Sequence, residues 1–231
     1  MNTPEDPIFR ITEQPPQPIQ GVALDMDGLL FDTEPVYFEV LDQLLIRRGL
    51  RYTPDLQQKM MGQVGVAAAR TLLDHHRLDE DPAELMAECA RDYGLRIKMG
   101  VDDRPGLDSL LKRLRESELP FGVATSSYRE FFDTLFAERD WSRELAFVIT
   151  GDDVDRGKPD PQIYLKASEA MAIDSSSMLV LEDSQNGIRS AVAANAIAVA
   201  VPNEETLTHD FQGAAAVVKS LDTPWLLDWL R

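Results

Sequence analysis

Two aspartates at the end of the first apolar run carry side chains that can do chemistry. Asp25 and Asp27 close the stretch GVALDMD, and Gly28 lets the backbone turn beside them. Two ionised carboxylates about 4 Å apart repel each other by roughly 4 kcal/mol at an effective dielectric constant near 20. A cation between them would remove this repulsion, so further groups that complete a charged site are expected elsewhere in the chain.

Polar side chains also stand where three later apolar runs end. The run PFGVATS ends in Thr125 and Ser126, AFVITGD is followed by Lys158, and SMLVLED ends in Glu182 and Asp183. Ligands of open α/β sheets bind outside the carboxyl ends of the strands. If these runs are neighbouring parallel strands, their acids, hydroxyls and lysine are expected to meet at one edge of the sheet.

These residue types suit phosphoryl transfer through an aspartyl-phosphate. A carboxylate can attack phosphorus as a nucleophile. A second acid, Asp27, can protonate the leaving oxygen and later deprotonate water. Mg²⁺ held by Asp25, Asp27 and Asp183 would relieve the repulsion between the carboxylates and would also bind a phosphate oxygen.

The remaining charge of a bound phosphate needs hydrogen-bond donors and a cation. Thr125 supplies a hydroxyl group, and Lys158 supplies a compact positive charge. The backbone amides of Ser126 and Ser127 are expected to open a helix N-terminus, which is a favourable place for an anion. The sequence therefore predicts a phosphate-binding set that faces the two aspartates.

The elements that must position these side chains form an alternating series. The apolar runs, to which AIAVAVP adds a fifth, are nearly continuous, as strands covered on both faces should be. Residues 107–116, 160–172 and 185–196 lie between or after the runs and have helical patterns. Strands that alternate with helices predict an α/β fold with a doubly wound parallel sheet, that is, a Rossmann-like core.

One long segment interrupts the alternation. Residues 36–49, 66–76 and 81–94 all have helical periodicity, and no convincing strand lies among them. We interpret residues 34–101 as an inserted all-helical domain, and the resemblance described below identifies such an insertion as a cap domain. The core is then expected at 19–33 and 102–231, with an N-terminal tail at 1–18 that is rich in proline and glutamate.

Composition limits the classes of function. The chain has 231 residues, a formal net charge of −17 and one cysteine, Cys89. A nucleic-acid partner is not expected, because duplex affinity depends on lysine and arginine that neutralise phosphates. The single cysteine fits a reducing compartment, and neither a signal peptide nor a membrane-spanning run is evident. We expect a cytoplasmic protein, a monomer or weak dimer, with a small phosphorylated metabolite as its partner.

Four motifs in order resemble those of the haloacid dehalogenase superfamily of phosphohydrolases. They are DMDGLLFDTE, VATSS, GKPDPQIY and LEDSQNGI, and the resemblance extends over about residues 19–203. The helical insertion resembles the small cap of the subfamily that contains β-phosphoglucomutase and pseudouridine-5'-phosphatase. The resemblance implies that Asp25 is the nucleophile and Asp27 the general acid and base.

The same resemblance assigns the remaining roles. Thr125 and Lys158 are expected to bind the transferring phosphoryl group. Asp183, with Glu182 beside it, is expected to bind Mg²⁺ together with Asp25 and the backbone carbonyl of Asp27. A loop that begins at Gly62 and Gln63 is a candidate for substrate binding.

Two other functions compete with that of a phosphatase acting on a sugar, polyol or nucleoside monophosphate. Mutases of the β-phosphoglucomutase type carry a histidine after the first motif and an arginine in a cap loop. The corresponding positions here hold Tyr37 and Gly65, so the phosphatase is favoured over the mutase. A non-catalytic sugar-phosphate sensor is the third interpretation, although every catalytic group of the family pattern is present.

Overall fold

The described part of the chain forms two compact units. The computed structural model describes residues 9, 14–60, 63 and 65–231. One unit contains the residues up to Asp32 and those from Asp102 onward, and the other contains Thr33–Val101. The first unit holds every strand of the sheet, and the second consists of helices and their connections. The division therefore falls near the end of the first motif, between Asp32 and Thr33.

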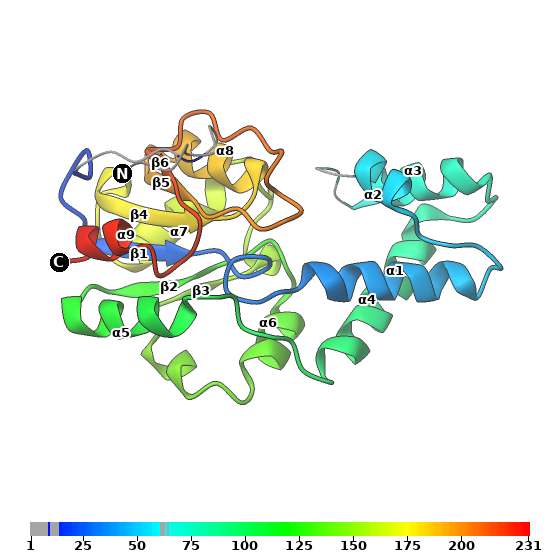
Figure 1. The fold of residues 1–231 in the computed structure, drawn as a ribbon, viewed down its shortest axis with the longest axis horizontal. Coiled ribbons are helices and arrows are strands. Elements are labelled where there is room, and N and C mark those ends of the chain that lie inside the picture. Colours follow the sequence, from blue (N-terminus) through cyan, green and yellow to red (C-terminus); the bar gives the residue numbers. More distant parts are fainter. Residues whose placement is uncertain (1–8, 10–13, 61–62, 64) are drawn as a thin grey trace, which may run out of the picture. The chain divides into compact units, whose positions relative to one another are not determined.

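The first unit is built around a parallel six-stranded sheet, as the alternating pattern predicts (Figure 1). The order of the strands is β3-β2-β1-β4-β5-β6, and every neighbouring pair is parallel. The sequence predicted five strands and missed β6, which has two residues and is too short to be seen as a run. The strands are β1 (Gly21–Leu24), β2 (Phe121–Ala124), β3 (Val148–Ile149), β4 (Met178–Glu182), β5 (Ile197–Ala200) and β6 (Ala216–Val217).

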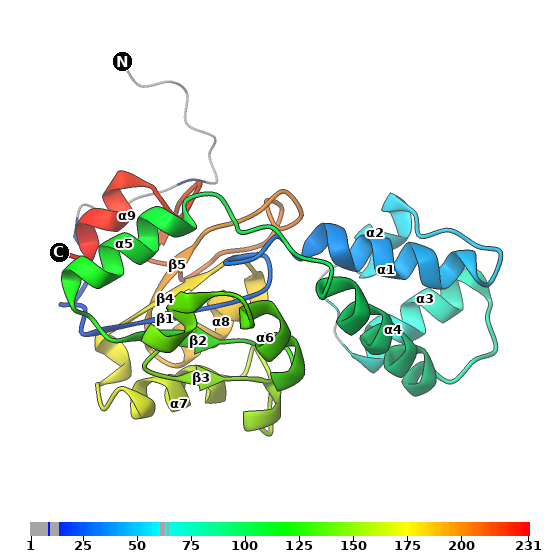
Figure 2. The same ribbon diagram turned by 90° about the horizontal axis from the view of Figure 1, so that it is seen from below.

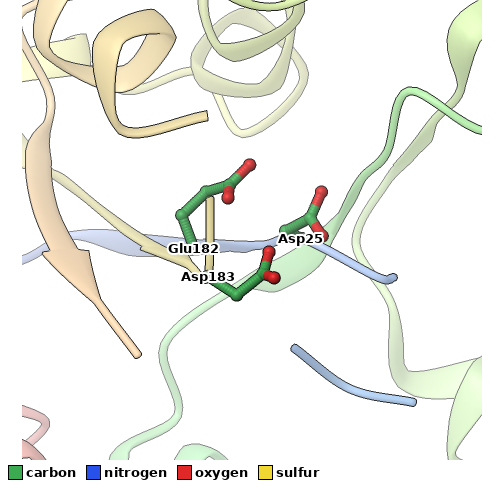
Figure 3. A group of neighbouring side chains, drawn as sticks. All are labelled: Asp25, Glu182 and Asp183. Atoms are coloured by element: carbon green, nitrogen blue, oxygen red, sulfur yellow. The ribbon is translucent and has the colours of Figure 1, made fainter. Parts of the chain in front are cut away.

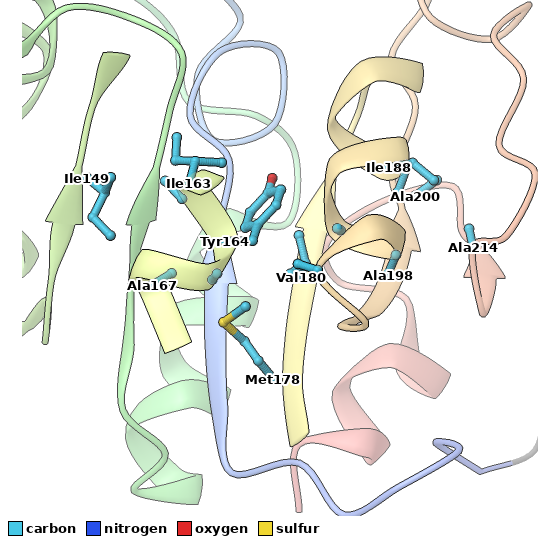
Figure 4. Close-up of a cluster of buried hydrophobic side chains, with 14 of the residues drawn as sticks. Ile149, Ile163, Tyr164, Ala167, Met178, Val180, Ile188, Ala198, Ala200 and Ala214 are labelled. Atoms are coloured by element: carbon cyan, nitrogen blue, oxygen red, sulfur yellow. The ribbon is translucent and has the colours of Figure 1, made fainter. Parts of the chain in front are cut away.

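Helices cover both faces of this sheet, which explains why its central strands are apolar throughout. On one face, α7 (Gln162–Ala170) and α8 (Gln185–Ala193) enclose a core that includes Tyr164, Val180 and Ile188 (Figure 4). On the opposite face lie α5 (Leu107–Ser117) and α9 (Pro224–Trp229), which Arg113 Nε links by a hydrogen bond to Leu227 O (Figure 2). The remaining helix, α6 (Arg129–Phe136), follows β2.

The order of the strands reverses at β1. The chain runs outward from β1 through β2 to β3 on one side, and β4, β5 and β6 extend on the other. Leu24 pairs with Val123 of β2 and with Leu181 of β4, and the Asp25 N–H donates to Leu181 O at 3.0 Å. Residues that follow β1, β2 and β4 therefore emerge together at the topological switch point, where ligands of such sheets bind.

The second unit has its own small apolar core. Its helices are α1 (Glu34–Ile46), α2 (Pro54–Met60), α3 (Val66–His76) and α4 (Pro82–Ile97). Leu44, Leu56 and Leu72 belong to one buried cluster, and the Asp81 side chain caps α4 by accepting from Ala83 N at 2.7 Å. Within the residues that the structure describes, each helix of the protein is too short or too polar to span a bilayer.

The two ends of the helical unit join the first unit at adjacent points. The Asp32 N–H donates to Asp102 O at 2.8 Å, and the Arg104 N–H donates to Leu30 O at 2.8 Å. Phe31 and Asp103 form an antiparallel bridge between these hydrogen bonds. The chain thus leaves the first unit after Asp32, near the end of the motif of Asp25, and returns to it at Asp102 beside the same loop.

Candidate active site

A buried lysine joins the ends of three strands. Lys158 Nζ donates to Asp25 Oδ1 at 2.5 Å, to Glu182 Oε1 at 2.8 Å and to the backbone carbonyl of Ala124 at 3.0 Å. The Lys158 side chain is 5% exposed, so these bonds lie outside the screening of bulk water. The lysine that follows β3 therefore reaches the edge where the acids of β1 and β4 lie.

Hydrogen bonds to both oxygens hold the carboxylate of Glu182 in place. Its Oε1 also accepts from the Tyr164 hydroxyl at 3.2 Å, and its Oε2 accepts from the backbone N–H and the hydroxyl of Ser184, both at 2.9 Å. Only 1% of the residue is exposed. The resemblance placed Glu182 beside the metal; this geometry makes it in addition the fixed counter-charge of Lys158.

One lysine, Lys158, contacts two buried acids, Asp25 and Glu182. Burial raises the pKa of the Asp25 carboxyl from 3.8 to about 8, with Lys158 opposing the shift and the carboxylates of Glu182 and Asp27 adding to it. Burial opposes the charge on Lys158, but Asp25 and Glu182 outweigh it and hold the pKa of the lysine well above its usual range. Without a metal ion, the cluster keeps a proton that a divalent cation would replace.

This proton predicts how stability changes with pH in metal-free buffer. The folded protein keeps Asp25 protonated up to a pH of about 8, whereas the unfolded chain releases that proton near its ordinary pKa of 3.8. Between these values the folded state binds more protons, so its stability is expected to fall as the pH rises. Urea unfolding at several pH values should show a steeper fall for the native protein than for Asp25→Asn, and equal slopes would contradict the assignment.

Asp27 lies at the same edge, where hydroxyl groups orient it. Its Oδ2 accepts from Ser127 Oγ at 2.7 Å and from Thr125 Oγ1 at 3.2 Å. Thr125 is buried, and its Oγ1 also accepts from the Ser127 N–H at 3.0 Å. A carboxyl group fixed at the edge beside Asp25 is well placed to move a proton to or from a reacting oxygen.

Three carboxylates could hold a metal ion. Asp25, Glu182 and Asp183 are all buried, and one oxygen of each lies within 4.8 Å of the others. Figure 3 shows the carboxyl groups of Asp25 and Asp183 beside one another at the ends of β1 and β4. A set of hard carboxylate oxygens suits Mg²⁺, which binds through few carboxylates and keeps much of its water.

Comparison with known protein families identifies the family of this chain. A family model described as haloacid dehalogenase-like hydrolase matches residues 22–201, which include Asp25, Lys158 and Glu182. This chain belongs to the haloacid dehalogenase-like hydrolase family. The membership inferred from the four motifs is confirmed.

Relatives of this haloacid dehalogenase-like hydrolase are named as phosphatases. The bifunctional riboflavin kinase/FMN phosphatase of Arabidopsis thaliana is 29% identical over 87% of this chain, which spans only 53% of that relative's length. Validoxylamine A 7'-phosphate phosphatase of Streptomyces hygroscopicus is 32% identical, with 84% of this chain and 89% of that protein covered. The structure of β-phosphoglucomutase from Clostridium difficile, 20% identical with a TM-score of 0.74 over 92% of this chain and 97% of that one, has the same fold.

Some residues predicted for the hydrolase site lie apart from the cluster or outside the described residues. Ser126 is exposed, and the helix expected to begin there begins at Arg129, so the predicted helix N-terminus at Ser126 and Ser127 is wrong. Gly62 lies outside the described residues. Gln63 is exposed and bonds within the helical unit, where its side chain donates to Lys59 O at 2.9 Å. A role for the Gly62–Gln63 loop stays a prediction.

Sequence reasoning assigned no role to three side chains that shape the hydrolase site. The hydroxyls of Ser127 and Tyr164 contact Asp27 and Glu182, and Asn203 contacts Asp183. Ser127 and Tyr164 belong to the VATSS and GKPDPQIY motifs, and their membership of these motifs could have predicted that they lie near the site. Asn203 lies in none of the motifs, and its contact depends on the loop after β5.

The space beneath Glu182 gives a sharp test of this packing. A Cβ at Gly187 would lie 1.6 Å from Glu182 Oε1. Alanine usually stabilises a helix relative to glycine by about 1 kcal/mol. Gly187→Ala is expected to do the opposite and destabilise the protein by about 1–3 kcal/mol through overpacking.

Gly157→Ala is the control, because a Cβ there meets nothing within 4 Å. Urea unfolding of both variants checks the difference, and a Gly187→Ala protein as stable as the native one would refute it.

Proposed function

We propose that this protein is a Mg²⁺-dependent phosphatase that hydrolyses a small phosphorylated metabolite through an aspartyl-phosphate on Asp25. The observation that carries the proposal is the buried contact of Lys158 Nζ with both Asp25 and Glu182. It supports Asp25 as the nucleophile, because it brings this carboxylate beside a positive charge at the switch point of the sheet. Asp27, 2.7 Å from the Ser127 hydroxyl, supplies the second acid that the chemistry needs.

In the first half-reaction, the ionised Asp25 attacks the phosphorus of the monoester. A phosphorus–oxygen bond forms to Asp25 as the bond to the leaving oxygen breaks, and Asp27 donates a proton to that oxygen. Lys158 and the Thr125 hydroxyl hold the oxygens of the transferring group and offset its charge. The products are the alcohol and the phosphorylated aspartate.

In the second half-reaction, water attacks the phosphorus atom of the phosphorylated aspartate, and the bond between phosphorus and the Asp25 oxygen breaks. Asp27, now ionised, accepts the proton of this water, inorganic phosphate leaves, and Asp25 and Asp27 regain their starting states. The hydrogen bond from Ser127 Oγ, at 2.7 Å, holds the Asp27 carboxyl group in place and leaves the Thr125 hydroxyl able to turn to the phosphoryl group. The same acid therefore serves both halves without a second proton carrier.

The carboxylates of Asp25 and Asp183 would hold the ion, with Glu182 beside them. When bound, Mg²⁺ would supply positive charge between the carboxylates and the phosphate, so that nucleophile and substrate can both be anionic. The donor set fits this ion, because the three buried carboxylates of Asp25, Glu182 and Asp183 lie close together, and the lysine beside them contacts only Asp25 and Glu182. In the absence of the ion, burial, with a smaller contribution from the neighbouring acids, raises the pKa of Asp25 and favours its protonated form.

The substrate class is proposed from chemistry and from the relatives. Two relatives carry names that specify phosphate monoesters of small molecules, FMN and validoxylamine A 7'-phosphate. A sugar, polyol or nucleoside monophosphate has the same reacting group. The net charge of −17 agrees with a small metabolite rather than a nucleic acid as the partner.

Phosphate release from a panel of such monophosphates, with Mg²⁺ and with EDTA, tests the proposal. Release with Mg²⁺, none with EDTA, and none from Asp25→Asn is the expected result. Equal release in EDTA would overturn the metal requirement. Conversion of a sugar monophosphate into its isomer on addition of a sugar bisphosphate, with little phosphate released, would instead identify a mutase. Binding of a sugar phosphate without either reaction would identify a sensor.

A further inference from the structure

Asn203 lies outside the four motifs and yet contacts the candidate metal site. It follows β5 and is 5% exposed. Its Nδ2 donates to Asp183 Oδ2 at 2.8 Å and to the backbone carbonyl of Gly28 at 3.3 Å. One amide group therefore links the segments that follow β1, β4 and β5.

The orientation of this amide is fixed by its other half. Asn203 Oδ1 accepts from the backbone N–H groups of Glu205 at 3.0 Å and Thr206 at 3.1 Å. The Asn203 N–H in turn donates to Thr206 Oγ1 at 2.9 Å. A flipped amide would place its oxygen against the Asp183 carboxylate and its NH₂ group against two backbone donors. The loop after β5 thus ensures that a donor faces Asp183.

The glycine of the first motif leaves space for this pair. Gly28 has a φ of +75°, and a Cβ there would lie 2.5 Å from Asp183 Oδ2 and 2.7 Å from Asn203 Nδ2. A side chain at this position would meet both partners of the hydrogen bond. The absence of a side chain at Gly28 therefore allows the hydrogen bond between Asn203 and Asp183 to form, and it also allows the turn after Asp27.

We infer that Asn203 is a positioning residue of the metal site, which it serves by fixing the carboxylate of Asp183. The inference depends on the Mg²⁺ site of the proposed function. A carboxylate with one oxygen held by a rigid donor presents its second oxygen in a defined direction. The side chain therefore loses less conformational entropy when an ion binds. Loss of such an outer partner typically weakens metal affinity by about 10–100-fold.

Asn203→Ser tests the role of the donor. A serine hydroxyl can accept from the backbone two residues on and so maintain the turn, but it is too short to reach Asp183. The Kd for Mn²⁺, measured by electron paramagnetic resonance on metal-free protein, is expected to rise by about 10–100-fold. The Mg²⁺ concentration for half-maximal phosphate release should rise in parallel, and KM at saturating Mg²⁺ should stay within about twofold.

Thr206→Ser is the matched control. Thr206 is as buried as Asn203 and belongs to the same turn; serine keeps its hydroxyl and removes a methyl group. This change loosens the loop without removing the donor to Asp183, so the Kd for Mn²⁺ is expected to stay within about twofold of the native value. Thermal unfolding of the metal-free proteins shows whether the two variants are destabilised to a similar extent.

The outcomes separate this inference from the proposed function. Absence of Mn²⁺ binding by the native protein would overturn the metal site itself. Native binding with an unchanged Kd in Asn203→Ser would overturn the role of Asn203 alone, as would an equal loss in Thr206→Ser. If Asn203→Ser does not fold, Asn203→Thr fills more of the space, keeps the hydroxyl acceptor and is judged by the same Kd.

Discussion

Phosphate release is expected to fall by about 10⁴-fold or more in Asp25→Asn, because an amide cannot replace the nucleophilic carboxylate. Stability should not fall with it. Asparagine has the same shape, can still accept from Lys158 and removes one of two buried acids that share a single lysine. The variant should therefore unfold in urea at a concentration equal to or above that of the native protein.

The control for this variant changes an exposed aspartate that lies outside the four motifs. Asp108 is exposed in the first turn of α5, and Asp108→Asn is expected to change phosphate release by less than about twofold. Mass spectrometry of acid-quenched native protein during turnover should detect a phosphorylated peptide that contains Asp25. Turnover by Asp25→Asn at the native rate, or a phosphate attached elsewhere, would refute the assigned nucleophile.

The second large effect is expected for Lys158→Met, which removes the buried positive charge that contacts Glu182 and Asp25. Removal of one partner of a buried ion pair typically costs about 3–5 kcal/mol, since a charge is left buried without compensation. The free energy of unfolding at neutral pH in metal-free buffer should fall by that amount. Phosphate release should also fall by about 10²–10³-fold, because a donor to the transferring group is lost.

A second substitution shows whether this loss comes from unbalanced charge. Adding Glu182→Gln to Lys158→Met removes one buried charge, and the double variant is expected to recover at least about 1 kcal/mol relative to Lys158→Met. Lys112→Met is the control, since that side chain is 77% exposed on α5 and should change stability by less than about 0.5 kcal/mol. A double variant less stable than Lys158→Met would show that charge balance is not the cause.

The main groups of the site could be located from sequence because a parallel sheet imposes a common edge. Asp25, Thr125 and Glu182 each follow or end an apolar run, and neighbouring parallel strands bring such positions together without further information. Lys158 lies several residues beyond the end of β3. It was predicted because it follows the third apolar run and belongs to the motif GKPDPQIY, and periodicity played no part.

The details that sequence missed depend on loops and on local hydrogen bonds. A helix was expected at Ser126 and Ser127, but the Thr125 hydroxyl accepts from the Ser127 N–H and offers the backbone an alternative to the helical turn. The contact of Asn203 with Asp183 requires β5 to pair beside β4 and the following loop to turn back, and neither is encoded in local spacing. Strand β6 is held by pairing with β5 rather than by its own pattern.

The junction at Asp32 and Asp102 has a consequence for how proteins of this type diversify. The backbones of Asp32 and Asp102 are joined directly by a hydrogen bond. The sixty-nine residues from Thr33 to Val101 therefore begin and end at neighbouring points of the first unit. An insert of another length or another architecture would meet the same two anchor points and leave the strand pairings undisturbed. Recombination at this junction can therefore replace one accessory module with another while the reacting groups stay in register.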